Sequence, residues 1–184
     1  LLTSASLDLV IRTTRNRVTT LTMNMPDRFN GWTFSMMGAL RDAFEVAASA
    51  DETQVVVLTG CDPYYSAGVN LGGTLRLAHP KKLHRMIAEH NQNLFDMFLD
   101  FPKPILAAVN GPAIGASVTS ATLCDAIIAS ENATFSTPFA RLGVVPEGCS
   151  SILFEKILGE ENAERMLGEE GWVPKGKDAL EAGL

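Results

Sequence analysis

The sequence predicts an α/β fold in which strands and helices alternate around an at least partly parallel sheet. Two short apolar runs, at 55–58 and 105–109, suit strands that are buried on both faces. Between them, residues 80–99 show the spacing of an amphipathic helix. This strand–helix–strand order is typical of a parallel sheet. The 184 residues, 46% apolar and 20% charged, fit one folded domain over 1–184, with no repeat, low-complexity tract or linker to divide it.

Local patterns justify the other elements in chain order. Alternating apolar residues within 7–23 predict a β-hairpin, and a loop rich in turn formers follows at 26–31. Apolar residues then recur at helical spacing over 33–50, where Thr33 or Ser35 could cap the helix. Beyond the second buried strand, the sequence predicts a tightly packed helix at 115–123, strands at 126–129 and 134–136, a loop at 138–148, and helices at 150–158, 161–167 and 177–182.

Composition excludes several classes of protein. Fifteen Lys and Arg against 21 Asp and Glu give a net charge of −6, which argues against a general nucleic-acid binder. No apolar run reaches the roughly 18 to 20 residues that span a bilayer, so we predict no membrane span. Three scattered cysteines offer neither a metal-binding spacing nor an even disulfide set, which favours a reducing compartment. We expect all three to be small core or near-core residues.

The two ends of the chain suggest trimming. It begins at Leu1 instead of a methionine and stops at Leu184 directly after a predicted helix. The start shows no charged segment followed by an apolar run, so no signal peptide is visible.

Two loops rich in small residues each follow a buried strand. The first covers 65–71, and taken alone it is explained by an ordinary tight loop. The second runs from Gly111 to Ser117 and opens a helix, where free N–H groups favour negative charge. Together the two loops could present paired N–H groups to one oxygen atom, an arrangement called an oxyanion hole.

Glu147 is the candidate catalytic acid or base. Its neighbours are apolar or small, so burial could raise the pKa of its carboxyl group toward neutrality. On its own, the plainer alternative is an acid placed at the start of a helix, where the helix dipole favours it. His84 and His90 are six positions apart and do not share a helix face, so we predict no zinc pair and no other metal site.

Several motifs occur in a familiar order. They are Met23–Pro26 with Phe29–Gly31, Tyr65–Leu71, Lys103–Ile105 through Asn110–Gly111 and Gly115, Cys124–Asp125 with Ala133–Phe135, and Ala179–Leu184. With these motifs the chain resembles the crotonase, or enoyl-CoA hydratase/isomerase, superfamily over almost its whole length.

The resemblance implies a spiral of ββα units that binds acyl-CoA thioesters. It implies that the thioester oxygen accepts hydrogen bonds from the N–H groups of Val69 and Ala116, and that the Ala67 region contacts the adenine end of CoA. It also implies a homotrimer or hexamer, C-terminal helices that this chain does not include, and no cofactor besides the CoA of the substrate. The substrate-binding residues implied are Arg28, Asn30, Ser66, Ala67, Gly68, Asn70, Leu71, Gly115, Pro138, Phe139 and Leu142.

Departures from the family pattern narrow the expected reaction. The two glutamates of the hydratases fall at Thr119 and Phe139, so both are absent here. Glu147 instead stands where the Δ3,Δ2-enoyl-CoA isomerases, above all the peroxisomal type, carry a single acid. Asn70 replaces the usual aspartate, which bears on a local loop hydrogen bond. We therefore expect isomerisation of 3-enoyl-CoA to trans-2-enoyl-CoA in fatty-acid β-oxidation, in a peroxisome-like organelle or a mitochondrion.

Three alternatives stay open at this point. One is an acyl-CoA-binding member of the fold without catalytic activity, and another is an enoyl-CoA hydratase. The third is different chemistry on the same enolate, such as dienoyl isomerisation or thioester hydrolysis.

Overall fold

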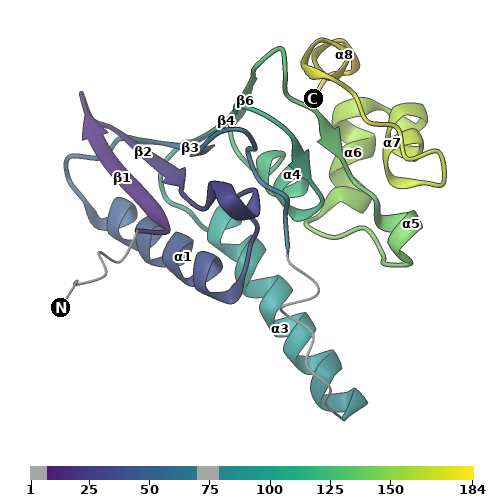
Figure 1. The fold of residues 1–184 in the computed structure, drawn as a ribbon, viewed down its shortest axis with the longest axis horizontal. Coiled ribbons are helices and arrows are strands. Elements are labelled where there is room, and N and C mark those ends of the chain that lie inside the picture. Colours follow the sequence, from purple (N-terminus) through teal and green to yellow (C-terminus); the bar gives the residue numbers. More distant parts are fainter. Residues whose placement is uncertain (1–7, 70–78) are drawn as a thin grey trace.

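The computed structural model describes residues 8–69 and 79–184. Its main sheet has five strands in the order β1-β2-β3-β4-β6, with β1 antiparallel to β2 and every other neighbouring pair parallel (Figure 1). This confirms the predicted α/β class with a partly parallel sheet. The strands are β1 (Val10–Arg15), β2 (Val18–Met23), β3 (Val55–Gly60), β4 (Ile105–Val109) and β6 (Ala126–Ala129).

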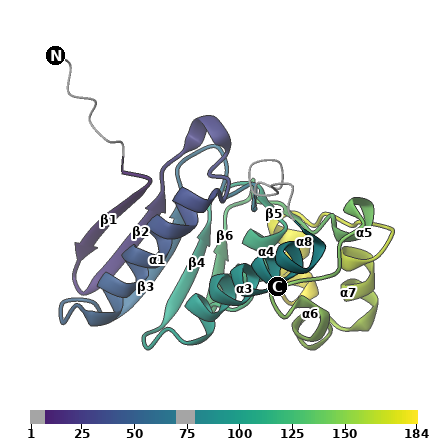
Figure 2. The same cartoon turned by 90° about the horizontal axis from the view of Figure 1, so that it is seen from below.

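Two long helices pack on one face of the main sheet, as Figure 2 shows. Helix α1 (Phe34–Ser49) begins after Thr33, whose hydroxyl oxygen accepts a hydrogen bond from the Met36 N–H at 3.2 Å. Helix α3 (Pro80–Leu99) crosses the body of the protein with its C-terminal half, and its N-terminal half extends away from the sheet (Figure 1). Along β2 and β3, every second residue is buried and the residues between are more exposed. This two-residue period is that of a strand, whose side chains point alternately to its two faces.

The other elements are short, and most of them lie after β4 in the chain. Strands β5 (Ala113–Ile114) and β7 (Phe135–Ser136) form a small parallel sheet. The remaining elements are η1 (Pro26–Arg28), α4 (Ala116–Ala121), α5 (Phe139–Leu142), α6 (Ser150–Leu158), α7 (Glu160–Leu167) and α8 (Gly176–Ala182).

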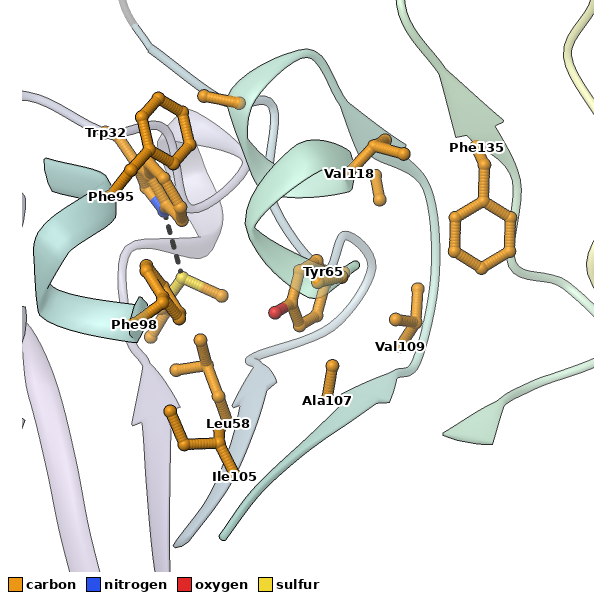
Figure 3. Close-up of a cluster of buried hydrophobic side chains, with 14 of the residues drawn as sticks. Trp32, Leu58, Tyr65, Phe95, Phe98, Ile105, Ala107, Val109, Val118 and Phe135 are labelled. Carbon is orange, nitrogen blue, oxygen red and sulfur yellow. Dashed lines mark hydrogen bonds between the residues drawn. The ribbon is translucent and has the colours of Figure 1, made fainter. Parts of the chain in front are cut away.

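Aromatic side chains fill the space between the main sheet and α3 (Figure 3). The Trp32 ring stacks on Phe98 with a centroid separation of 6.4 Å, and its indole N–H donates to the Met23 sulfur at 3.2 Å. Each such side chain contributes about 1.5 to 3 kcal/mol through burial. The hydroxyl of Tyr65 is buried in this core without a hydrogen-bond partner among the described residues.

The sequence predictions differ from the structure at short elements and at one cysteine. The predicted loop at 138–148 contains the single turn α5, and the two-residue strand β5 was not expected. Such short elements carry no readable period and form because neighbouring segments supply their hydrogen bonds. Cys149 is exposed, and not near the core as predicted, because it occupies a left-handed position that precedes α6. No helix in the described part of the chain is long and apolar enough to cross a membrane.

Candidate active site

The loop that follows β3 lies directly against the segment that leads into α4. The Ile114 N–H donates to the Ser66 carbonyl oxygen at 3.0 Å, and the Ser117 hydroxyl donates to the same oxygen at 2.9 Å. A Cβ atom at Gly68 would collide with the Ile114 carbonyl and lie 3.5 Å from the Ala116 nitrogen. The two small-residue loops predicted from the sequence are therefore in contact, and glycine permits their close approach.

Val69 and Ala116 are the predicted oxyanion donors, and each lies on one of these loops. Gly115 has a φ of 59° and precedes α4, so Ala116 is the first residue of that helix. Within the described part of the chain, neither the Val69 nor the Ala116 N–H donates to a backbone carbonyl. An N–H group without such a partner is the kind that can donate to an acceptor from outside the chain.

The side chains of Asn30 and Ser66 form hydrogen bonds with the backbone in and around the first loop. Both are fully buried. The Asn30 amide donates to the carbonyls of Cys61 and Tyr64, at 2.7 Å each, and its oxygen accepts from the Met25 N–H. The Ser66 hydroxyl donates to the Asn30 carbonyl at 2.8 Å and accepts from the Gly68 N–H. The side chains of these two predicted substrate-binding residues are thus buried in the structure, where they hydrogen-bond the backbone around the loop.

The other predicted binding residues of this region are spread around the loop. Ala67 is half-buried, and its N–H donates to the Phe29 carbonyl at 2.9 Å. Arg28 is exposed on η1, next to Phe29. Asn70 and Leu71 lie outside the described residues.

Glu147 is half-buried in the loop between α5 and α6. Its Oε2 accepts a hydrogen bond of 2.8 Å from the Asn91 amide, which projects from α3. Burial raises the pKa of the Glu147 carboxyl group above its usual value, and the hydrogen bond from Asn91 opposes that rise. The raised pKa agrees in direction with the sequence prediction.

Close packing connects Glu147 to the start of α4. A Cβ atom at the neighbouring Gly148 would lie 2.5 Å from both the Phe95 ring and the Thr119 hydroxyl oxygen. That hydroxyl donates to the Ala116 carbonyl at 3.2 Å. The backbone next to Glu147 therefore lies close to Thr119, three positions after the predicted oxyanion donor Ala116.

Pro138, Phe139 and Leu142 lie on or beside α5. Pro138 is half-buried and Phe139 is buried, whereas the Leu142 side chain is 51% exposed. In this structure Leu142 therefore does not belong to a buried apolar wall. No group of three or more His, Cys, Asp or Glu residues that could hold a metal ion occurs in residues 8–69 and 79–184.

The sequence reasoning missed Asn91. A signal was present, because Asn91 precedes Phe95 and Phe98 by four and seven positions and so shares their buried helix face. A polar residue on such a face needs a hydrogen-bond partner, which here is Glu147.

The arrangement can perform proton transfer next to a stabilised anion. A carboxylate with a raised pKa is a suitable general base near neutral pH. Two backbone N–H groups on adjacent loops can stabilise an oxyanion.

Comparisons with known proteins show the family of the chain. Residues 13–184 match the Enoyl-CoA hydratase/isomerase family model. The chain is 38% identical over 161 residues to the mouse protein Enoyl-CoA delta isomerase 3, peroxisomal, covering 86% of this chain and 50% of that protein. It is 40% identical over 159 residues to rat Enoyl-CoA delta isomerase 2, covering 86% of this chain and 40% of that protein. The chain thus spans half or less of the length of these two relatives.

A solved structure shows the same fold. The enoyl-CoA hydratase/isomerase from Pseudoalteromonas atlantica T6c superposes with a TM-score of 0.81 at 31% identity, covering 95% of this chain and 67% of the other. This likeness confirms the predicted crotonase-like fold. With the family model matched over nearly its full length, the chain belongs to the enoyl-CoA hydratase/isomerase family.

Proposed function

We propose that this protein isomerises 3-enoyl-CoA to trans-2-enoyl-CoA with Glu147 as its single acid–base group. The observation that carries the proposal is the half-buried Glu147 carboxylate, which is hydrogen-bonded by Asn91 and precedes a glycine that lies close to Thr119 of α4. The two delta-isomerase relatives support the same reaction.

In the proposed mechanism, Glu147 removes a proton from C2 of the substrate. The electron pair moves onto the thioester oxygen, which gives a dienolate that accepts hydrogen bonds from the Val69 and Ala116 N–H groups. Glu147 then returns the proton to C4, and the double bond ends between C2 and C3. One carboxylate is enough, because one proton is moved and no water is added.

The environment of Glu147 suits both halves of this proton shuttle. Burial raises the carboxyl pKa, which makes the carboxylate a stronger base, while the Asn91 amide favours the ionised form that must accept the proton. A hydratase needs a pair of carboxylates to position water. The two family positions for that pair hold Thr119, which is buried on α4, and Phe139, which is buried on α5.

The remaining features of the proposal follow the family resemblance. We propose an acyl-CoA thioester as substrate, no further cofactor, and a homotrimer or hexamer as the assembly. A peroxisome-like organelle or a mitochondrion is the proposed location, and the mouse relative named as peroxisomal supports the former.

A comparison of Glu147→Gln with Glu155→Gln tests the reaction. Both substitutions remove one carboxylate, but Glu155 is exposed on α6. We expect Glu147→Gln to lower the turnover of 3-enoyl-CoA by about 10²- to 10⁴-fold, the range of general acid–base catalysis. Glu155→Gln should leave it unchanged.

Further measurements separate this function from its alternatives. Calorimetry should show that Glu147→Gln still binds the product trans-2-enoyl-CoA. Binding by the wild-type protein without turnover of any 3-enoyl-CoA would instead indicate an acyl-CoA-binding protein. Formation of 3-hydroxyacyl-CoA from the trans-2 isomer would indicate a hydratase.

A further inference from the structure

The Ser117 side chain lies where the two small-residue loops meet. It is fully buried on the first turn of α4. Its hydroxyl oxygen accepts from the Ile114 N–H at 2.9 Å, and its proton can be donated to the carbonyl oxygens of Ser66 at 2.9 Å and Ile114 at 3.0 Å. These two carbonyls share the one hydroxyl proton. The Ser117 hydroxyl therefore connects the start of α4 both to the segment before it and to the loop after β3.

Ile114 and Ser117 stand on either side of the peptide group that carries the Ala116 N–H. Gly115 lies between them with φ 59° and ψ −123°, a conformation that is easy for glycine and rare for other residues. Glycine has no Cβ to restrict its backbone, so its own side chain does not hold this turn. The hydrogen bond between the Ile114 N–H and the Ser117 hydroxyl spans the turn. This bond fixes the direction in which the Ala116 N–H points.

Ser66 continues the connection to the second predicted donor. Its carbonyl oxygen accepts from the Ser117 hydroxyl, and its own hydroxyl accepts from the Gly68 N–H at 3.0 Å. Gly68 directly precedes Val69, and a Cβ atom at Gly68 would lie 3.5 Å from the Ala116 nitrogen. Two buried serines thus link the backbone beside one predicted oxyanion donor to the backbone beside the other.

The Ser117 hydroxyl is not placed to attack a substrate. In the described part of the chain its hydrogen-bond partners are all backbone groups, and none is an imidazole or carboxylate that would activate a nucleophile. The side chain is also fully buried. A buried hydroxyl that bonds the backbone on both sides of a site determines geometry instead of taking part in bond formation.

We infer that Ser117 is a positioning residue that sets the spacing and direction of the Val69 and Ala116 N–H groups. This inference rests on the proposed function, in which these two groups stabilise the dienolate oxygen. Donors aimed at a developing oxyanion act mainly in the transition state, so a shift in their position lowers kcat more than it raises KM. Complete loss of one such donor costs about 10²- to 10³-fold in kcat.

A comparison of Ser117→Ala with Ser120→Ala tests this role. Ser120 is also fully buried on α4, and its hydroxyl donates to the Ser117 carbonyl of the same helix at 3.2 Å. Each substitution removes one buried hydroxyl, but only that of Ser117 reaches the two loops. We expect Ser117→Ala to lower kcat for 3-enoyl-CoA about 10- to 100-fold with little change in KM. Ser120→Ala should keep both values, and the acidic limb of the pH profile, which Glu147 sets, should stay in place in both variants.

The carbonyl frequency of a bound thioester reports on the donors without any turnover. Hydrogen bonds to a carbonyl oxygen polarise the C=O bond and lower its stretching frequency. Infrared difference spectra of trans-2-enoyl-CoA labelled with ¹³C at C1 should show this downshift on binding to the wild type, to Ser120→Ala and to Glu147→Gln. The downshift should be smaller in Ser117→Ala. Circular dichroism confirms folding, and Ser117→Cys, whose thiol donates only weakly, takes the place of the alanine variant if that variant does not fold.

Three results would overturn the inference. They are a Ser117→Ala protein with normal kcat and the full carbonyl downshift, equal losses in Ser117→Ala and Ser120→Ala, and a wild-type protein that causes no carbonyl downshift. Failure of the proposed function looks different. The wild type would then not convert 3-enoyl-CoA, while the carbonyl downshift would still separate Ser117→Ala from Ser120→Ala.

Discussion

The Asn91 amide donates a 2.8 Å hydrogen bond to Oε2 of Glu147 across 56 positions of sequence. It connects the middle of a long helix to a loop in the last third of the chain. The amide fixes the direction of the carboxylate and favours its ionised form.

Replacement of Asn91 by alanine should affect both the rate and its pH dependence. The hydrogen bond stabilises the carboxylate, so its loss raises the pKa of Glu147 further above its usual value. The acidic limb of the kcat/KM profile should therefore move to higher pH. We also expect kcat to fall about 10- to 100-fold, because the base is no longer held in position. A profile of 3-enoyl-CoA turnover against pH measures both effects.

The exposed Gln92 on the same helix provides the control for that experiment. Gln92→Ala should keep the wild-type profile. An acidic limb that stays in place in Asn91→Ala, or moves to lower pH, would contradict a role for Asn91 in setting the pKa.

Glu147→Gln should make the protein more stable at neutral pH. Burial raises the pKa of this carboxyl group in the folded state, so folding favours the protonated form and disfavours the carboxylate. The free energy of unfolding of the wild type therefore falls as pH rises from the unfolded pKa through the raised folded pKa. The neutral amide of the variant does not pay this penalty.

Thermal unfolding at pH 4 and pH 8 measures the effect on stability. The midpoint of Glu147→Gln should exceed that of the wild type at pH 8, and the gap should narrow at pH 4. Equal gaps at both values would show that the carboxylate carries no burial penalty.

Gly148→Ala should destabilise the protein more than Gly143→Ala. Both glycines have positive φ, 63° and 67°, so both substitutions carry the cost of a left-handed alanine, about 1 kcal/mol. A Cβ at Gly143 meets nothing within 4 Å, whereas at Gly148 it collides with Phe95 and Thr119. We expect about 1 to 3 kcal/mol of additional loss from this overpacking. Urea denaturation of the two variants measures the difference, and similar losses in both would refute the collision.

Tyr65→Phe should raise the free energy of unfolding. The Tyr65 hydroxyl is buried and has no hydrogen-bond partner among the described residues, and burial also raises the pKa of the phenol well above its usual value. Removal of such a group recovers about 1 to 3 kcal/mol. Tyr64→Phe, at a half-buried ring packed at a tilt against Phe29, should change the stability little. A less stable Tyr65→Phe would show that the hydroxyl has a partner after all.

Much of the fold could be predicted from sequence because its long elements have clear periods. Residues 80–99 and 105–109 show helix and strand patterns that match the bounds of α3 and β4. The short α5 and β5 could not be predicted in this way, since two to four residues contain no full period.

The candidate site was predictable only in part. Small residues marked the two loops, and the apolar surroundings of Glu147 marked a carboxyl group with a raised pKa. The bond from Asn91 depends on how α3 crosses the sheet, which no local pattern encodes. The hydrogen bonds that the buried Asn30 amide makes could not be predicted for the same reason, because its partners lie 31 and 34 positions away in the sequence.

The packing at Gly148 also limits how this scaffold could change its reaction. The Thr119 hydroxyl touches the space that a side chain at position 148 would need, and the family resemblance implies that hydratases carry a glutamate at position 119. A longer side chain at 119 that took this direction would meet the Phe95 ring and the backbone at Gly148. A carboxylate gained at position 119 would therefore compete for volume with the segment that carries Glu147, so a change of the chemistry at this site requires coordinated substitutions and not a single one.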